Sequence, residues 1–385
     1  MVVPIFGKNP PREWPSAMPP DCPVGPSPVL RGIRLEGPHV RYTDADTWFP
    51  SWAADGHMYS PWTDGHIDQW ASNSKWLCAM TGYARIEGDS PLDLHVVPLG
   101  TMMGHPGPYV GRYPSGCLHV GGVWYHGTYL VHEERAPDGR MRDLLGPFVG
   151  FRKSSDGGVT WLPDRYTPLA TMFGETLEGR PPIKVGSPRF VDFGCELEHS
   201  PDGKAYMVAF GNLAGHGHLN WILGDAVFLG RADPRHDDLC DAAAWEWFAG
   251  NDCDTTWSAK LADAVPIFTW PRSVGQLSMT YFAGVDRYLM CISYARRDAV
   301  PTTSYIVDAP APWGPWTMVG HWEGFGQQAY FLNFPSRFIA PNGETAWLCY
   351  SANHTDQYAS SDGILEDPIG SRYAMCLHEV RLLRR

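Results

Sequence analysis

Two aspartates stand at matched distances from a turn signal near the start of the chain. In residues 44–65 the dipeptide Asp55-Gly56 separates two apolar, aromatic-rich runs, which predicts a β-hairpin. Asp46 and Asp64 each lie about nine residues from Asp55, so an antiparallel hairpin brings both carboxylates to its open end. Paired carboxylates on rigid strands suit general acid/base chemistry on a glycosidic bond. The plainer alternative is a surface hairpin with aspartates in its flanking loops.

The same hairpin pattern recurs four times along the chain. Each copy is an apolar run, a Gly-containing turn, and an aromatic residue followed by a second apolar run. The copies cover residues 116–133, 195–212, 276–294 and 333–354, and the equivalent aromatics are Tyr59, Tyr125, Tyr206, Tyr288 and Trp347. Room for two more strands separates successive hairpins. Five copies of a four-stranded antiparallel unit predict an all-β, five-bladed β-propeller around a central funnel.

The propeller hypothesis divides the chain into two parts. Residues 1–28 are Pro-rich and aperiodic, which predicts an irregular N-terminal arm packed on the surface. Residues 29–385 form the single propeller domain, and the run at 29–35 would close the ring by completing the last blade. One short helical turn is expected within 238–248. The alternative architecture is a pair of β-sandwiches.

The composition excludes some classes of binding partner and favours others. The formal charge of −12, without a basic cluster, argues against nucleic acid and anionic membranes. Aromatic residues make up 13% of the chain, including 17 Trp, and indole rings stack well on the apolar faces of sugars. Nine Cys without a C-x-x-C pair indicate buried free thiols rather than disulfides or a zinc site. No signal peptide or transmembrane run is visible, so we expect a cytoplasmic protein, or a secreted one if a signal was removed.

In a propeller, residues just before the first strand and just after the second strand of each blade converge on one end of the funnel. These positions are strongly polar here: Asp46, Tyr113, Asp192, Gln276 and Asn333 come before first strands, and Asp64, His132, Glu133, Asn212, Tyr294, Asn353 and His354 come after second strands. In the third hairpin, Glu196, Glu198 and His199 alternate along an expected inner strand. Such acidic residues would line the channel, or form an ion pair with Arg189 or Arg337.

The first hairpin, with Asp46 before an Asp-Gly turn, resembles the first blade of glycoside hydrolase family 43 and related propellers. That resemblance implies that Asp46 is the catalytic base. The segment ELEHSPDGKAY at 196–206 looks like the blade that carries the acid glutamate. The family also has a pKa-tuning aspartate, which is not evident near residues 113–117 of this chain. Asp64 or Asp192 would take its role. Separately, SSDGGVTW at 154–161 resembles the Asp box of sialidase-like propellers, a structural turn away from the active site.

The leading hypothesis is therefore a glycoside hydrolase acting on an oligo- or polysaccharide. Glu198 or Glu196 would be the acid and Asp46 the base, with Asp64 or Asp192 tuning the pair. Carboxyls on opposite blades would suit the wide spacing of an inverting mechanism. The residues expected to hold the sugar are Trp48, Tyr113, His119, His132, Glu133, His199, Asn212, Gln276, Tyr294, Asn333, Arg337 and His354.

Other functions stay open. A polysaccharide lyase would use His and Tyr to abstract a proton beside a uronate that Arg neutralises. Its candidate residues are His119, His126, His132, His199, Tyr113, Tyr294 and Arg337. A third possibility is a non-catalytic carbohydrate-binding propeller. No cofactor is expected, although a structural cation such as calcium could occupy the funnel. His216 and His218 with Asp237 and Asp238 are only a weak metal signal.

Overall fold

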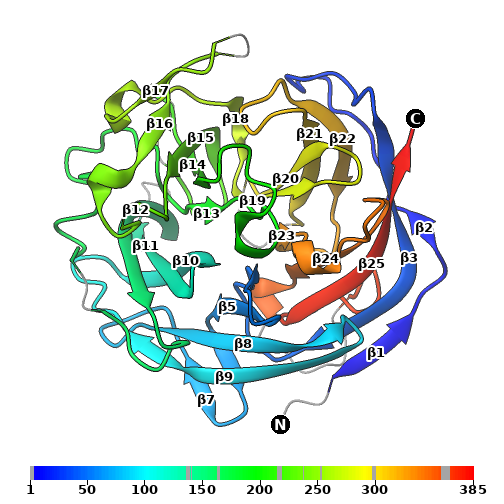
Figure 1. Ribbon diagram of the computed structural model, residues 1–385, viewed down its shortest axis with the longest axis horizontal. Helices are drawn as coiled ribbons and strands as arrows, with labels where there is room; N and C mark the ends of the chain where they lie inside the picture. The colour runs from blue at the N-terminus through cyan, green and yellow to red at the C-terminus, as the bar shows by residue number, and fades with distance from the viewer. Residues whose placement is uncertain are drawn as a thin grey trace.

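The computed structural model describes residues 4–135, 139, 141–162, 165–214, 219–236, 238–251, 254–296, 301–356 and 365–385. Antiparallel sheets stand around a central axis as five blades, each with its innermost strand at the centre of the ring (Figure 1). The predicted five-bladed β-propeller is confirmed. His216, His218 and Asp237, which belong to the weak metal signal, lie outside the described residues.

The blades follow one another along the chain. Blade 1 contains β4 (Ser51–Trp52), β5 (Met58–Trp62), β8 (Met80–Ser90) and β9 (Asp93–Met103), with the small hairpin β6 (Gly65–Ile67) and β7 (Trp70–Ser72) beside it. Blade 2 contains β10 (Gly111–Val120), β11 (Val123–Arg135) and β12 (Met141–Ser154). Blade 3 contains β13 (Arg189–Phe190), β14 (Ala205–Gly211), β15 (Gly224–Ala232), β16 (Glu246–Phe248) and β17 (Trp257–Ser258), and β18 (Phe268–Val274) also pairs with β15.

Blades 4 and 5 complete the ring. Blade 4 contains β19 (Gln276–Phe282), β20 (Arg287–Tyr294), β21 (Thr303–Ala309) and β22 (Thr317–Glu323). Blade 5 contains β23 (Tyr330–Asn333), β24 (Thr345–Ser351), β25 (Met375–Arg384), β3 (Leu30–Tyr42) and β1 (Ile5–Lys8), and β2 (Arg12–Glu13) also pairs with β3. The short 3₁₀ turns are η1 (Cys195–Leu197), η2 (Ala242–Ala244), η3 (Leu261–Asp263), η4 (Ser336–Phe338) and η5 (His354–Asp356). The expected helical turn within 238–248 is η2.

The repeated aromatics mark equivalent strands. All five lie on the second strand of their blades: Tyr59 on β5, Tyr125 on β11, Tyr206 on β14, Tyr288 on β20 and Trp347 on β24. These strands are covered on both faces by neighbouring blades, and every residue of β14 is buried. A strand buried on both faces needs a continuous apolar run, which is why these segments read as uninterrupted hydrophobic sequence.

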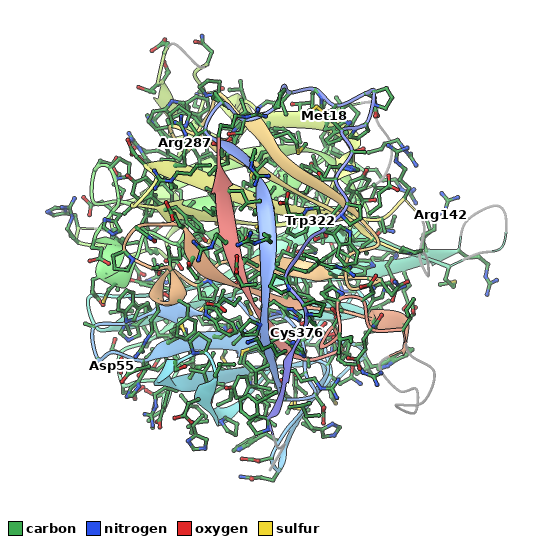
Figure 2. All side chains as sticks on the ribbon, turned by 90° about the vertical axis from the view of Figure 1, so that its right-hand side faces the viewer. Met18, Asp55, Arg142, Arg287, Trp322 and Cys376 are labelled. Atoms are coloured by element: carbon green, nitrogen blue, oxygen red, sulfur yellow. The ribbon has the colours of Figure 1, made fainter. Side chains whose placement is uncertain are left out.

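Strand β3 closes the ring by pairing with a strand from the other end of the chain. β3 pairs antiparallel with β25 near the C-terminus, and the two strands run side by side in Figure 2. This confirms that residues 29–35 complete the last blade. The arm before β3 is less irregular than expected, because β1 and β2 pair with β3 and add edge strands to blade 5.

The two ends of the ring differ. At the turn end lie the hairpin turns, including the one at Asp55; at the open end, Asp46 and Thr63 exchange backbone hydrogen bonds of 3.0 Å. Figure 2 shows Asp55 and Arg142, the latter at the start of β12, on opposite faces of the ring. At the turn end η1 and η4 lie over the centre of the ring (Figure 1), joined by the Ser336 N–H donating to Asp192 Oδ2 at 2.8 Å.

The segment that resembles an Asp box forms a tight turn after β12. The Asp156 carboxylate accepts hydrogen bonds from the Thr160 N–H (2.9 Å) and hydroxyl (2.6 Å), and these bonds lower its pKa to about 2. Trp161 packs against Tyr83 and Trp124 of the blade interior. The turn lies at the turn end, far from the Asp46 pair, in keeping with a structural part. The described cysteines are all free thiols, as expected.

Candidate active site

A pocket of about 420 Å³ occupies the open end of the ring. It receives side chains from blades 1, 2 and 5 and from the loop before β15, and it combines carboxylates, phenols and indole rings. Its lining consists of Asp46, Thr47, Asp64, Asn73, Lys75, Trp76, Tyr113, Tyr129, Val131, Asp143, Trp221, Tyr330, Phe331, His354, Thr355 and Tyr373. Both aspartates of the first hairpin are present, as the hairpin geometry predicts.

Asp46 is the more deeply buried member of the pair, at 6% exposure. Its Oδ2 accepts a 2.7 Å hydrogen bond from the Tyr330 hydroxyl, and its Oδ1 accepts one of 2.9 Å from the Thr47 hydroxyl. Burial raises the pKa of Asp46 well above its ordinary value, the negative charge of Asp64 raises it further, and the hydroxyl donors oppose the shift only in part. Asp46 therefore holds a proton far more readily than an ordinary aspartic acid.

Asp64 keeps some exposure to the pocket and is held by one residue. Its Oδ1 accepts from the Ser74 N–H at 2.7 Å, and its Oδ2 accepts from the Ser74 hydroxyl at 2.5 Å. Burial raises the pKa of Asp64, while the bonds from Ser74 and the charge of Lys75 lower it. Because the Asp64 charge acts on the Asp46 pKa, Asp64 ionises first, and the pair retains one proton on Asp46.

The backbone is strained beside both carboxylates. Thr47 has a φ of 65° and Asp64 a φ of 51°, in the left-handed region that non-glycine residues rarely adopt. Strain of this kind is concentrated at functional sites, where it holds side chains in a set orientation. Here it turns the two carboxylates of one hairpin toward the same pocket.

Four tyrosines surround the carboxylates. Burial raises the pKa of Tyr113, Tyr330 and Tyr373 well above its ordinary value, and the carboxylate charges add to the shift. Burial likewise raises the pKa of Tyr129, although the charge of Arg189 acts against it. These phenols are therefore protonated at neutral pH, so they donate hydrogen bonds and do not abstract protons.

Among the described residues that line the pocket, Lys75 is the one with a permanent positive charge. Its ammonium lies 3.0 Å from Glu133 Oε1 and 4.0 Å from Asp143 Oδ1. Burial lowers the pKa of Lys75, but these two carboxylates outweigh burial and raise it. Glu133 does not line the pocket itself, and its contact with Lys75 holds the ammonium group in place.

Glu196 and Glu198, the predicted acids, lie at the wrong end of the ring. The prediction of an inner strand here is wrong, because the chain leaves the sheet after the two-residue strand β13. Gly194 (φ 89°) and Glu196 (φ 53°) then turn it into η1. Glu196 Oε2 accepts a 2.6 Å hydrogen bond from the N–H of Gly121, in the turn between β10 and β11.

Other predicted ligands join these glutamates at the turn end. His119 Nδ1 lies 3.7 Å from Glu196 Oε1, and its ring stacks on Tyr59. His199 Nε2 lies 3.8 Å from Glu198 Oε1 and is partly exposed on that face. None of these side chains reaches the open-end pocket, so their predicted roles in catalysis or sugar binding are not supported.

Asp192 and Arg337 also lie at the turn end. The prediction places Asp192 before the first strand of blade 3, but it follows β13, and Arg337, an expected sugar ligand, follows β23. Asp192 accepts backbone hydrogen bonds from Gly194 (3.0 Å) and Ser336 (2.8 Å), so it ties η1 to η4. Arg337 donates to Asp89 Oδ1 at 2.6 Å, near the end of β8. The alternative of ion pairs between the two glutamates and Arg189 or Arg337 does not occur in the described part of the chain.

Several predicted sugar ligands are packing residues. Trp48 is 1% exposed and donates its indole N–H to the Ala45 carbonyl at 2.8 Å, so it cannot stack on a sugar. Tyr294 packs among the aromatic side chains of Trp270 and Tyr305. His126, named for the lyase alternative, is completely buried.

Gln276 and Asn333 lie deeper in the channel. Gln276 donates to the Trp221 carbonyl at 2.6 Å and accepts from Arg189 at 3.4 Å, and Asn333 donates to the Trp48 carbonyl at 2.9 Å. Both are buried, at 1% and 6% exposure, so they support the pocket from below. Asn353 is buried as well and donates to the Ser371 carbonyl.

Of the predicted sugar ligands, Tyr113 and His354 line the pocket, while His132 and Asn212 line a second pocket nearby. Sequence reasoning missed Lys75, Asp143, Trp221, Tyr330 and Tyr373. Tyr330 begins β23, so placing the first strand of blade 5 at 330–333 would have found it. Within the described residues no group of three or more His, Cys, Asp or Glu side chains could hold a metal ion, and no helix is long and apolar enough to span a membrane.

No protein-family model and no curated protein matches this chain. Similar solved structures include a protein of unknown function from Dyadobacter fermentans, with 12% identity over 92% of this chain and 100% of that chain, and a TM-score of 0.45. Another is a family 43 glycoside hydrolase from Xanthomonas citri complexed with xylotriose (13% identity, 88% and 87% coverage, TM-score 0.43). A third is the family 117 glycoside hydrolase Zg3597 from Zobellia galactanivorans (10% identity, 98% and 90% coverage, TM-score 0.44). Likeness at this level assigns no activity to the chain.

Proposed function

We propose that the protein is a glycoside hydrolase that acts on an oligo- or polysaccharide at the open-end pocket. The observation that carries the proposal is the Asp46–Asp64 pair, two buried carboxylates of one hairpin whose pKa values are raised to different extents. Two carboxyl groups in unlike environments are the requirement for acid and base roles in glycosidic bond cleavage.

The electrostatics favour particular roles for the pair. The pKa of Asp46 is raised further than that of Asp64, so Asp46 holds its proton to higher pH and is assigned as the general acid that protonates the leaving glycosidic oxygen. Asp64 ionises first and is the carboxylate that activates water or stabilises positive charge at the sugar. This assignment replaces Glu198 as the acid and moves Asp46 from base to acid. The reason for expecting inversion also falls away, because both carboxylates come from one blade.

The rest of the pocket suits a sugar. Indole rings of Trp76 and Trp221 offer flat apolar surfaces, and Asn73, Lys75 and the protonated tyrosines offer hydrogen-bond donors to hydroxyl groups. Tyr330 orients Asp46 through the 2.7 Å bond to Oδ2. A single sugar unit bound here would contact both carboxylates.

The lyase alternative has less support. It needs a phenolate or imidazole base beside an Arg, yet the pocket tyrosines are held protonated and Arg337 lies at the turn end. His119 and His199 lie there too. A binding-only propeller would use the same pocket without requiring a difference between the two carboxylates.

The test is turnover of a panel of aryl glycosides and oligosaccharides, read as new reducing ends. Asp46→Asn and Asp64→Asn should each lower kcat by roughly 100-fold or more. Glu198→Gln, at the turn end, is the matched control and should keep kcat within about twofold. Hydrolysis that survives both aspartate changes would overturn the proposal, as would sugar binding without turnover by the wild-type protein.

A further inference from the structure

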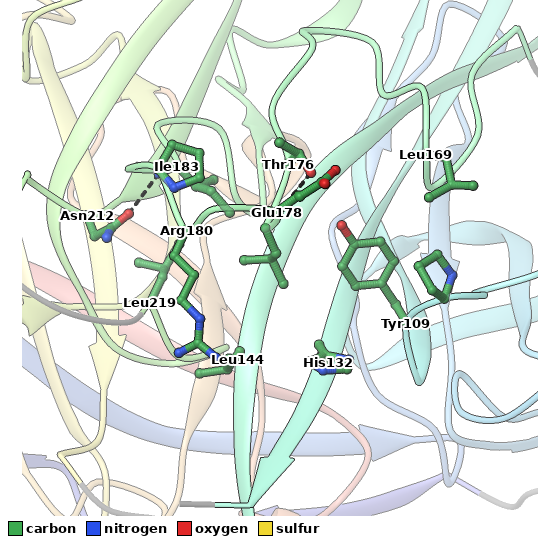
Figure 3. A pocket seen from close by; sticks show the side chains of 13 residues that line it. Tyr109, His132, Leu144, Leu169, Thr176, Glu178, Arg180, Ile183, Asn212 and Leu219 are labelled. Atoms are coloured by element: carbon green, nitrogen blue, oxygen red, sulfur yellow. Dashed lines mark hydrogen bonds between the residues drawn. The ribbon is translucent and has the colours of Figure 1, made fainter.

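A second pocket of about 390 Å³ lies at the open end between blades 2 and 3. Figure 3 shows its lining, with Tyr109 and His132 on one side, Ile183, Arg180 and Leu219 on the other, and Leu144 below Arg180. No part of the proposed acid/base chemistry uses these residues.

The two pockets share a wall. On β11, Val131 faces the first pocket and His132 the second; on β12, Asp143 faces the first and Leu144 the second. Consecutive residues of a strand point to opposite sides, so the wall is only one pair of strands thick. The two pockets are therefore separated by this pair of strands alone.

The rim between the pockets carries aromatic side chains. Trp76 lines the first pocket, is 65% exposed and has a left-handed φ of 73°. Its N–H donates to the Val110 carbonyl at 2.8 Å, which places its backbone beside Tyr109 of the second pocket. An exposed indole ring at the rim of a pocket offers a flat apolar surface to a sugar ring.

The chemistry of the second pocket matches a neutral sugar chain. Leu144, Leu219 and Ile183 form an almost fully buried apolar floor, and the Tyr109 ring stands edge-on to His132. Glu178 and Arg180 bring one negative and one positive charge to the mouth. Rings and aliphatic groups receive the apolar face of a sugar, and charged groups at the mouth bind hydroxyls.

We propose that the second pocket binds distal units of the same glycan whose scissile bond lies at Asp46 and Asp64. The substrate is then a neutral oligosaccharide chain that crosses the wall beside Trp76 and Tyr109, and not a small monoglycoside. This inference rests on the proposed function for its catalytic end, but binding at the second pocket does not depend on turnover.

The experiment compares linear neutral oligosaccharides, from disaccharide to hexasaccharide, of the type that the panel shows to be cleaved. In wild type, kcat/KM should rise with chain length. Tyr109→Ala should lower the hexasaccharide-to-disaccharide ratio of kcat/KM roughly tenfold, about 1.4 kcal/mol. Tyr281→Ala, which changes a tyrosine at the turn end, is the control for Tyr109→Ala and should leave the ratio unchanged.

A binding arm separates this inference from the catalytic proposal. Calorimetry on Asp46→Asn with each hexasaccharide of the panel should show binding that weakens roughly tenfold when Tyr109→Ala is added. That result without any turnover by wild type would sustain the second pocket and reject the hydrolase. Turnover indifferent to chain length and to Tyr109→Ala would reject the second pocket alone, and binding of no hexasaccharide would also reject it.

Discussion

The hairpin of blade 1 carries aspartates whose pKa values are shifted in opposite directions, so replacing each by asparagine should change stability with opposite sign. Asp46, at the open end, has a pKa raised by burial and by Asp64. Its proton binds the folded state better than the unfolded state, so stability is highest at low pH and falls as pH rises past about 4. The further the folded pKa lies above the unfolded one, the more stability is lost between pH 4 and pH 7. The neutral amide introduced by Asp46→Asn mimics the protonated carboxyl group and avoids that loss.

Asp55, at the turn end, is the internal control. Burial acts to raise its pKa, but hydrogen bonds from the Tyr59 hydroxyl (2.6 Å) and the His57 N–H (2.9 Å) outweigh burial and lower it. Its stabilising effect is present above about pH 4 and is lost as pH falls through the folded pKa. Asp55→Asn should therefore destabilise the protein at pH 7 by a small amount, about 1 kcal/mol, since the group is largely exposed.

The assay is urea unfolding of wild type and both variants at pH 4 and pH 7. Asp46→Asn should match wild type at pH 4 and become more stable than wild type at pH 7, while Asp55→Asn should be less stable at pH 7 and converge on wild type at lower pH. A loss of stability in Asp46→Asn at pH 7 would show that Asp46 is ionised and stabilised by Tyr330 and Thr47, and a stability difference that is equal at both pH values would show that folding does not raise its pKa. The acid assignment would then fail.

Three further outcomes follow from single contacts. Tyr330→Phe removes the 2.7 Å bond to Asp46 Oδ2, so the pKa of Asp46 rises and the alkaline limb of kcat/KM should move up by about one pH unit. Ser74→Ala removes the hydroxyl bond to Asp64 Oδ2, so the acidic limb should move up by about one pH unit; an unmoved limb would exclude Asp64 as the ionising group. Burial and the nearby His39 lower the pKa of His378 to about 3, so the wild-type protein loses stability as pH falls from about 6.5. In urea unfolding, His378→Leu should remove about 3 kcal/mol of the loss between pH 6.5 and 4.5, and an unchanged acid dependence would contradict this account.

The sequence predicted the ring because its signals are local and repeated. A Gly-containing turn between two apolar runs specifies a hairpin, and five such hairpins with aromatics at equivalent positions specify five blades. The open end of blade 1 was predicted correctly for the same reason: once the turn at Asp55 is placed, antiparallel pairing brings Asp46 and Asp64 together.

The predicted site failed where a blade departs from a tight hairpin. In blade 3 the stretch from Glu196 to His199 alternates like a strand, but fourteen residues, 191–204, separate β13 from β14, and the true inner strand lies before them. In blade 5 the residues from 334 to 344 likewise separate β23 from β24. The prediction places the inner strand of these blades too late in the sequence. It therefore puts Glu198 and Arg337 at the open end of the ring, whereas they lie at the turn end. Tyr373 and Trp221 lie in loops that no repeat pattern marks.

Spacing alone does not decide which aspartate can act as an acid; burial and the neighbours do. Asp46 and Asp55 belong to the same hairpin, and each accepts a hydrogen bond from a tyrosine hydroxyl. Asp46 is buried beside a second carboxylate, so its charged form is disfavoured, whereas Asp55 is open to solvent and near His57 and His119, so its charged form is favoured. The propeller creates that difference by running one short hairpin from the solvated turn end to the enclosed open end, so burial raises the pKa of the aspartates at the open end, whereas hydrogen bonds lower that of Asp55 at the turn end.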